Sequence, residues 1–520
     1  MKHIEVLDTT LRDGAQSAQV TFSLKDKLSI LALLDDLGVE YAECGNPGAN
    51  DADMELFERL HAQGLRYAVL SPVAFTSTCE DPDTDMRFLR TMRASFDCVS
   101  IVGKASMSQV TDVLRMSPQE NLDMITRTIS AARARGKHVF FSAEHFFDGC
   151  RVDESYAFES VRTAIAAGAC TAVLCDTNGG MMPEDIAEMT KKLSSEGIRL
   201  GIHCHNDCGL AVANSLTAVR GGACHVQGTF CGIGERCGNA DLCVVIPDLQ
   251  LKLSYDVLPK DKLCLLASTA RAVADFANIS FNERTPYVGQ FAFSHKAGMH
   301  IDGFLKEPHS FEHISPECVG NRRRLLLSGL AGRAAVADRL TALCPDVTKD
   351  SDIVEKLLER IKKAEAAGYQ YDNSDGSLML LLLDALGRRK KYFELLDFKV
   401  VLSDPTSDAP TAALIKIKVG DTTALEADEG SGPVNAMDKA LRKALEHFYP
   451  QLKTVRLADY RVRVIDPDDA TNARVRVLID STDSKSSWRT IGVSRDIIEA
   501  SWEALCESFD YKLSQLDGLL

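Results

Sequence analysis

Short apolar runs that alternate with helical patterns occupy residues 4–232 of the 520-residue chain, and this rhythm constrains the fold most strongly. The runs are apolar on both faces, as strands buried in a parallel sheet are. They are Ile4–Thr10, Tyr41–Gly45, Arg66–Ser71, Cys98–Gly103, His138–His145, Thr171–Thr177, Leu200–Asp207 and His225–Gly232. Consecutive β/α units of this kind predict an α/β fold with a closed TIM (β/α)8 barrel. A doubly wound open sheet is the competing architecture.

Amphipathic helices are expected between the strands, because apolar residues recur there at helical spacing. Examples are Leu24–Leu37, Asn121–Arg135 and Tyr156–Ala167. A glycine follows each of them, where helices commonly end in a left-handed cap, namely Gly38, Gly136 and Gly168. We therefore expect a barrel domain over residues 1–275.

Two further regions follow the barrel. Residues 276–390 are predicted to form helical linker subdomains, with one helix over Asp352–Ala367. Residues 391–520 hold two groups of strands, each followed by a helix, which indicates an internal duplication. The expected strands are Phe398–Ser403, Ala413–Val419, Tyr460–Ile465, Ala473–Ile479 and Ser487–Val493. A duplicated α/β module at the end of an enzyme is typical of a regulatory or dimerisation domain.

The composition limits the partners of the chain. A net charge of -15 argues against nucleic acid or an anionic membrane as the main partner. The sequence has no apolar stretch of transmembrane length and no signal-peptide core. The 16 cysteines, in the absence of such a signal, predict reduced thiols and a cytoplasmic location.

A TIM barrel carries its active site at the carboxyl ends of its strands, so the polar residues there are the candidate site. His203 and His205 are two residues apart in a predicted strand and therefore face the same side. Asp13 follows the first strand, which lies close to the seventh in a closed barrel. Two imidazoles and a carboxylate predict a divalent metal site, to which Asn239 could add an oxygen. Mixed nitrogen and oxygen ligands suit Mn²⁺, Mg²⁺ or Zn²⁺.

Other strand ends supply candidate catalytic and substrate-binding groups. Arg12 is suited to a carboxylate or a developing oxyanion. Thr177 is positioned to bond a substrate carboxylate, and Glu144 is a candidate general base. Ser142 precedes Glu144 by two residues, shares its strand face, and is expected to shape the substrate pocket.

A glycine-rich loop follows the eighth strand, over Gly232–Asn239. Its G-x-G-x-x-x-G spacing, after the last strand of a series, excludes a nicotinamide fingerprint. Glycines allow the backbone to approach a ligand closely. We expect Gly232, Gly234 and Glu235 to lie close to a bound ligand.

Three motifs carry a family resemblance that covers essentially the whole chain. They are Asp8–Gly14, His203–Asp207 with Ala211–Ser215, and Gly232–Asn239. The chain resembles the family of metal-dependent TIM-barrel acyltransferases that includes 2-isopropylmalate, homocitrate and citramalate synthases. The terminal module is similar to the allosteric dimer domain of this family, with Gly432–Ala436 as its turn.

The resemblance implies roles for individual residues. The metal would be held by Asp13, His203, His205 and Asn239. Arg12 and Gln16 would face the 2-oxo acid, and Thr177 would bind its carboxylate. Glu144 would belong to the base machinery, and Gly232, Gly234 and Glu235 would form the acyl-CoA loop. His300 would be its helper, donated from the linker region of a partner subunit in a homodimer.

Several stretches are similar to the long citramalate synthase branch of the family, namely Ala143–Gly149, Pro286–Gly289, His295–His300 and Ile498–Trp502. This similarity implies condensation of acetyl-CoA with pyruvate to (R)-citramalate and CoA, in isoleucine biosynthesis. 2-Oxoisovalerate and 2-oxoglutarate are the alternative substrates, and an inactive amino-acid-sensing relative is the alternative from another class. The effector implied for the terminal module is isoleucine, or else leucine.

The sequence departs from this branch in a few places. Phe311 occupies a position where the branch usually has tyrosine. This difference calls into doubt a proton relay near the base. Ser142 and the pair Cys150 and Arg151 also differ from the usual residues.

Overall fold

The computed structural model describes the chain except residues 1, 64–68, 79, 95, 97, 297, 328–331, 403–409, 467–471, 484–485 and 520. Two compact units are present. One consists of Met1–Phe293 and Ile314–Arg323, and the other of Ser294–His313 and Arg324–Leu520. The finer division into residues 1–275, 276–390 and 391–520 stays a prediction.

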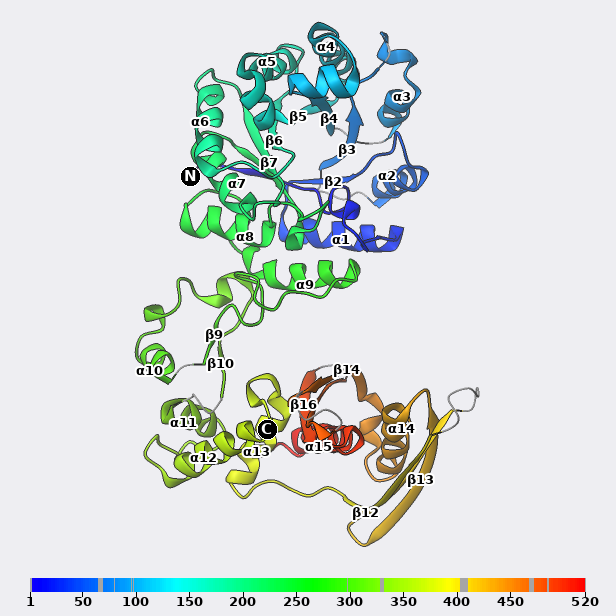
Figure 1. Ribbon diagram of the computed structural model, residues 1–520, viewed down its shortest axis with the longest axis vertical. Helices are drawn as coiled ribbons and strands as arrows, with labels where there is room; N and C mark the ends of the chain where they lie inside the picture. The colour runs from blue at the N-terminus through cyan, green and yellow to red at the C-terminus, as the bar shows by residue number, and fades with distance from the viewer. Residues whose placement is uncertain are drawn as a thin grey trace. The chain divides into compact units, whose positions relative to one another are not determined.

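The first unit is a closed barrel of parallel strands, which confirms the predicted fold (Figure 1). Closure occurs because β1 pairs with both β2 and β8, with Leu7 opposite Tyr41 and Glu5 opposite His225. The strands are β1 Glu5–Asp8, β2 Tyr41–Gly45, β3 Val69–Phe75, β4 Cys98–Lys104, β5 His138–Glu144, β6 Thr171–Asp176, β7 Leu200–Cys204 and β8 His225–Gly228.

Most strands end earlier than the sequence indicates, because their last polar residues turn into the loops at the barrel mouth. The eighth strand, expected to reach Gly232, ends at Gly228, and the seventh, expected to reach Asp207, ends at Cys204. His205 instead forms an isolated backbone bridge with Asn239. The expected strand Arg66–Ser71 lies partly outside the described residues, and β3 continues to Phe75.

The barrel helices begin and end at local sequence signals. Capping boxes start α1 at Ser23 and α4 at Ser117, and Gly38 closes α1 in the left-handed region with φ 88°. The helix expected at Tyr156–Ala167 begins earlier, because α5 continues through a kink at Asp153. The helices are α1 Leu24–Leu37, α2 Asp51–Gln63, α3 Met86–Arg93, α4 Pro118–Ala134, α5 Phe146–Ala166, α6 Pro183–Ser194, α7 Ala211–Arg220, α8 Leu242–Pro247 and α9 Leu266–Phe276.

The second unit contains linker helices and the duplicated module. The linker elements are β9 Ser294–His295, α10 Gly298–Lys306, β10 Arg324–Leu325, α11 Arg333–Thr341, α12 Asp352–Ala366 and α13 Asp375–Ala385. The first half of the module is β11 Glu394–Val401, β12 Thr411–Val419, β13 Thr422–Gly430 and α14 Pro433–Glu446. The second half is β14 Arg456–Val464, β15 Val475–Thr482, β16 Ser487–Ser494 and α15 Ile497–Leu516.

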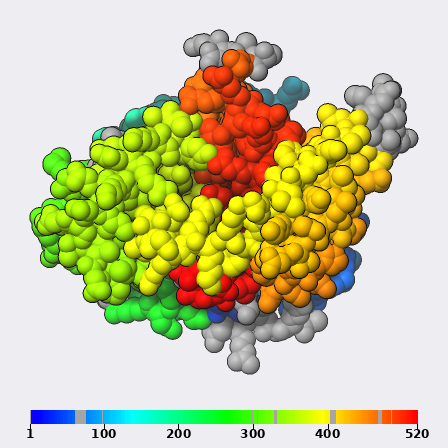
Figure 2. All heavy atoms as spheres, turned by 90° about the horizontal axis from the view of Figure 1, so that it is seen from below, coloured from blue at the N-terminus to red at the C-terminus, as the bar shows by residue number. Residues whose placement is uncertain are grey.

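Each half of the module is a three-stranded antiparallel sheet followed by a helix. The sequence had indicated only two strands in the first half and missed β13. The end of the expected strand Phe398–Ser403 lies outside the described residues. Figure 2 shows residues of α15 (red) between the linker helices (yellow-green) and the first half of the module (yellow to orange). Within the described chain, no helix has both the length and the apolar character needed to cross a membrane.

Candidate active site

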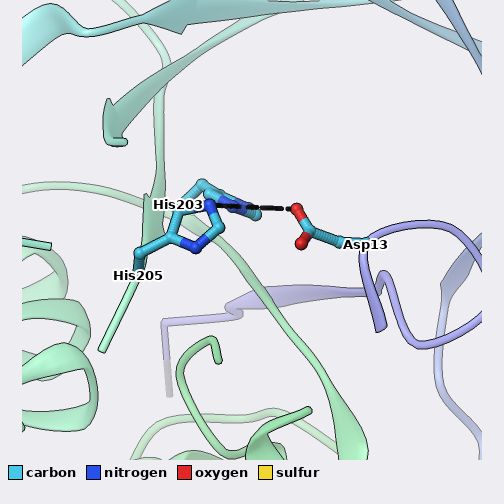
Figure 3. Close-up of side chains that lie close together, drawn as sticks. All are labelled: Asp13, His203 and His205. Carbon is cyan, nitrogen blue, oxygen red and sulfur yellow. Dashed lines mark hydrogen bonds and ion pairs between the residues drawn. The ribbon is translucent and has the colours of Figure 1, made fainter. Parts of the chain in front are cut away.

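Asp13, His203 and His205 converge at the carboxyl end of the barrel (Figure 3). Nε2 of His203 lies 3.4 Å from Oδ2 of Asp13, and Nε2 of His205 lies 4.0 Å from the same oxygen. The two imidazole Nε2 atoms are 3.4 Å apart. All three side chains are buried. The structure therefore gathers two nitrogens and a carboxylate oxygen around one point.

The barrel topology explains this convergence. His203 lies on β7, Asp13 follows β1, and both strands pair with β8. The loop after β8 returns Asn239 to the same place, where its Nδ2 donates to Oδ1 of Asp13 at 3.0 Å and to the carbonyl of Ile233 at 3.1 Å. Asn239 is thus hydrogen-bonded directly to Asp13.

Burial and charge set the ionisation of the cluster. Burial alone would raise the pKa of Asp13, but Arg12 and His203 outweigh it and hold the pKa well below its usual range. Burial and the adjacent His203 lower the pKa of His205 to about 4. An ionised carboxylate and a neutral imidazole are the forms that bind metal.

The donor set fits a divalent metal. Nδ1 of His203, Nδ1 of His205 and Oδ1 of Asn239 are buried and have no hydrogen-bond partner within the described part of the chain. The Nε2 atoms of both histidines and Oδ2 of Asp13 instead face one another, and a cation among them would be bound by all three buried groups, with the unpaired Oδ1 of Asn239 as a further candidate ligand. The cluster is therefore a candidate divalent metal site.

Arg12 is fixed by two carboxylates beside this cluster. Its Nε donates to Glu43 at 2.7 Å, and its Nη1 lies 3.1 Å from Asp13. Glu43 lies in the middle of β2, is 2 % exposed, and was not among the predicted site residues. With its guanidinium held on both sides, Arg12 can present the remaining N–H groups to an anion.

Glu144 ends β5 and forms an ion pair with Lys104, which ends β4 directly beside it. The sequence reasoning missed Lys104, although the rule that strand ends carry the site would have included it. The hydroxyl of Thr177 accepts a hydrogen bond from the backbone N–H of His145 at 2.8 Å. The hydroxyl hydrogen of Thr177 can therefore be donated elsewhere.

A cavity of about 480 Å³ lies at this mouth of the barrel. Its lining includes most of the residues singled out from the sequence, namely Arg12, Asp13, Gln16, Ser142, Glu144, Thr177, His203, His205 and Glu235. Val102, Cys175 and Gln227 also line it and had not been predicted. The cavity can therefore bind a small anion next to the candidate metal site.

The structure explains why Gly232 and Gly234 are glycines, which the sequence did not suggest. A Cβ atom at Gly234 would lie 2.1 Å from Nδ2 of Asn239, so only glycine allows that amide to approach Asp13. Gly232 has a φ of 63°, and its carbonyl accepts from the Asn239 N–H at 3.0 Å. The contact of this loop with an acyl-CoA stays a prediction.

His300 belongs to the second unit, where it is exposed on α10. Its imidazole stacks on Phe311 with 4.6 Å between ring centroids. The ring of Phe311 also fills the space beside Gly303, where a Cβ atom would be 2.6 Å from it. Phe311 is therefore packed against His300 and offers it no hydroxyl.

Comparison with known proteins agrees with this architecture. Residues 3–273 match the HMGL-like family, residues 287–368 the homocitrate synthase post-HMGL domain-like family, and residues 372–513 the LeuA allosteric (dimerisation) domain. The chain is 43% identical to an (R)-citramalate synthase from Aquifex aeolicus over 99% of both chains. It is 41% identical to one from Geobacter sulfurreducens, covering 100% of this chain and 99% of the relative.

A more distant relative, a probable 2-isopropylmalate synthase from Methanopyrus kandleri, is 30% identical over 96% of both chains. The closed barrel and its cluster of candidate metal ligands are those of a protein of the HMGL-like class. The chain belongs to the HMGL-like family and, within it, to the (R)-citramalate synthases.

Proposed function

We propose that the chain condenses acetyl-CoA with pyruvate to give (R)-citramalate and CoA, as a step of isoleucine biosynthesis. The observation that carries this proposal is full-length similarity of 41% and 43% to (R)-citramalate synthases, combined with the buried cluster of Asp13, His203 and His205. In the reaction, a carbon–carbon bond forms between the acetyl methyl carbon and the ketone carbon. Water then cleaves the thioester and CoA leaves as the thiol.

Asp13, His203 and His205 would hold a divalent metal, with Asn239 as a further oxygen ligand. Mn²⁺, Mg²⁺ and Zn²⁺ all suit this mixed donor set. When bound, the ion supplies Lewis-acid polarisation of the ketone of the 2-oxo acid. The convergence of both Nε2 atoms on Oδ2 of Asp13 and the unpaired buried amide oxygen of Asn239 support this assignment.

Arg12, Gln16 and Thr177 would orient the 2-oxo acid. Arg12 is held by Glu43 and Asp13, so its remaining N–H groups can stabilise the negative charge that develops on the ketone oxygen. The Thr177 hydroxyl, already accepting from the His145 N–H, can donate to the substrate carboxylate. Ser142 shapes the wall of the same cavity.

Glu144 would remove a proton from the acetyl methyl group, with His300 of a partner subunit as its helper. The position of Glu144 in the cavity supports the role of a base. Because Phe311 replaces the usual tyrosine, no hydroxyl at that position takes part in the proton transfer. The Gly232–Asn239 loop, including Glu235, would contact the acyl-CoA.

The terminal module would form a homodimer and bind an amino-acid effector, isoleucine first and leucine second. Its match to the LeuA allosteric (dimerisation) domain supports both roles. Calorimetric titration with each amino acid tests the effector. Binding of isoleucine with inhibition of activity is expected, and absence of binding of both amino acids would contradict it.

The decisive experiment measures release of free CoA with Mn²⁺ or Mg²⁺, acetyl-CoA and a panel of oxo acids. Pyruvate should give the highest kcat/KM, and the His203→Ala variant should lose activity. A higher kcat/KM with 2-oxoisovalerate or 2-oxoglutarate would instead indicate a 2-isopropylmalate or homocitrate synthase. Absence of turnover with every oxo acid would favour an inactive amino-acid sensor.

A further inference from the structure

Gln227 connects the floor of the active-site cavity to the interior of the barrel. It lies on β8 opposite His203 of β7, lines the cavity, and is 3 % exposed. Its Nε2 is 3.4 Å from Nε2 of His225, which is fully buried two residues earlier on the same strand. Because Gln227 adjoins a candidate metal ligand, the direction of its amide affects what can bind beside that ligand.

A second contact continues from His225 to the opposite end of the barrel. Nδ1 of His225 is 3.4 Å from Oε2 of Glu5 on β1, and Oε1 of Glu5 forms an ion pair of 2.5 Å with Arg199. The His225 ring is packed against Phe140, with 4.7 Å between centroids. Gln227, His225, Glu5 and Arg199 thus form one chain of polar contacts, which we call the axial chain.

Glu5 determines which nitrogen of His225 carries the proton. Burial alone would raise the pKa of Glu5, but His225 and Arg199 outweigh it and lower the pKa to about 2, so Glu5 is an acceptor only. His225 must then donate from Nδ1. In a neutral imidazole this leaves Nε2 as an acceptor.

The protonation of His225 in turn fixes the amide of Gln227. Only the NH₂ group can face an accepting Nε2, because the amide oxygen there would oppose a lone pair. The amide oxygen of Gln227 is therefore directed away from His225. Among the described residues, none donates a hydrogen bond to this oxygen.

We propose that Gln227 presents its amide oxygen to the cavity as a specificity-determining acceptor, and that Glu5 and His225 are positioning residues that maintain this orientation. The inference rests on the proposed function, since it takes the cavity to be the oxo-acid site. An acceptor at the floor disfavours an oxo acid that carries a second carboxylate. The axial chain therefore selects monocarboxylic 2-oxo acids.

The test compares two oxo acids of equal carbon number, 2-oxobutyrate and oxaloacetate, in the Mn²⁺-loaded enzyme. Equilibrium binding of each is measured by calorimetry, and kcat/KM by CoA release. Gln227→Met removes the acceptor and should lower the preference for 2-oxobutyrate about fivefold, the scale of one hydrogen-bonding group. Glu5→Met frees His225 to protonate Nε2, which turns the amide and should lower the preference at least as much.

Glu40→Met is the matched control, because Glu40 pairs with His3 at 3.0 Å and has no contact in the axial chain. It should keep the wild-type ratio of the two binding constants. A lower melting temperature with an unchanged ratio in both Gln227→Met and Glu5→Met would overturn the proposal, since a purely structural role predicts that result.

The proposed function and this inference fail in different ways. Selective oxo-acid binding without CoA release would reject the proposed reaction and leave the axial chain supported. Turnover of pyruvate, with the same ratio of 2-oxobutyrate to oxaloacetate binding constants in wild type, Gln227→Met and Glu5→Met, would support the proposed reaction and overturn the role of the axial chain. A wild-type enzyme that binds neither oxo acid and does not turn over pyruvate would overturn both.

Discussion

Glu507 on α15 is a buried acid whose replacement should stabilise the second unit in a pH-dependent way. Burial raises its pKa from 4.5 to about 7, although Ser377 and Arg389 oppose the shift. Between these two values the folded protein keeps a proton that the unfolded chain has lost. Stability therefore falls as the pH rises from about 4.5 to about 7, and the full cost is present above pH 7.

The size of the effect follows from the two pKa values. Each unit of difference corresponds to about 1.4 kcal/mol, so the cost at pH 8 is about 3 kcal/mol. At pH 5 it is below about 1 kcal/mol. Because 19% of the Glu507 side chain still reaches solvent, these figures are upper values. Glu507→Gln removes the ionisable group and should recover most of this free energy at pH 8.

The assay is urea-induced unfolding of wild type and Glu507→Gln at pH 5 and pH 8, followed through the transition of the second unit. Glu359→Gln, at an exposed position of α12, is the control and should be neutral at both pH values. A gain at pH 8 that exceeds the gain at pH 5 by about 2 kcal/mol supports the reasoning. Equal changes at the two pH values would refute it.

Three further substitutions and one rescue variant probe the active site. Lys104→Met should lower kcat about tenfold or more, because Glu144 loses its ion-pair partner, and Mn²⁺ binding measured by calorimetry should stay unchanged. Lys104→Arg keeps the positive charge and should restore kcat. An unchanged kcat in Lys104→Met would contradict this role. Asn239→Ala should weaken Mn²⁺ binding about 10- to 100-fold in the same titration, since it removes the amide that contacts Asp13. Gly234→Ala should weaken Mn²⁺ binding in the same direction, because its Cβ would displace that amide.

The barrel was predictable because buried parallel strands leave apolar runs separated by capped amphipathic helices. The strand β13, Thr422–Gly430, was not, because its alternation is mainly of polar and small residues and its buried positions are few. The same limit applies to α5, where the residues before Tyr156 look like a loop until the kink at Asp153 is known.

The candidate site, like the fold, could be predicted only in part. The grouping of Asp13, His203 and His205 could be predicted, because strand adjacency in a closed barrel determines which strand ends meet. Lys104 could not be assigned a partner from sequence alone, since its ion pair depends on the register of β4 with β5. The axial chain was also hidden, because Gln227 and His225 are ordinary interior positions until their side-chain contacts are seen.

The most direct test of the account is metal binding to metal-stripped protein by calorimetry. One Mn²⁺ per chain is expected in the wild type, and binding should be lost in His203→Ala and in His205→Ala. His138→Ala, an exposed histidine at the amino end of β5, should bind like the wild type. Wild-type stoichiometry and affinity in His203→Ala and His205→Ala would contradict the central claim.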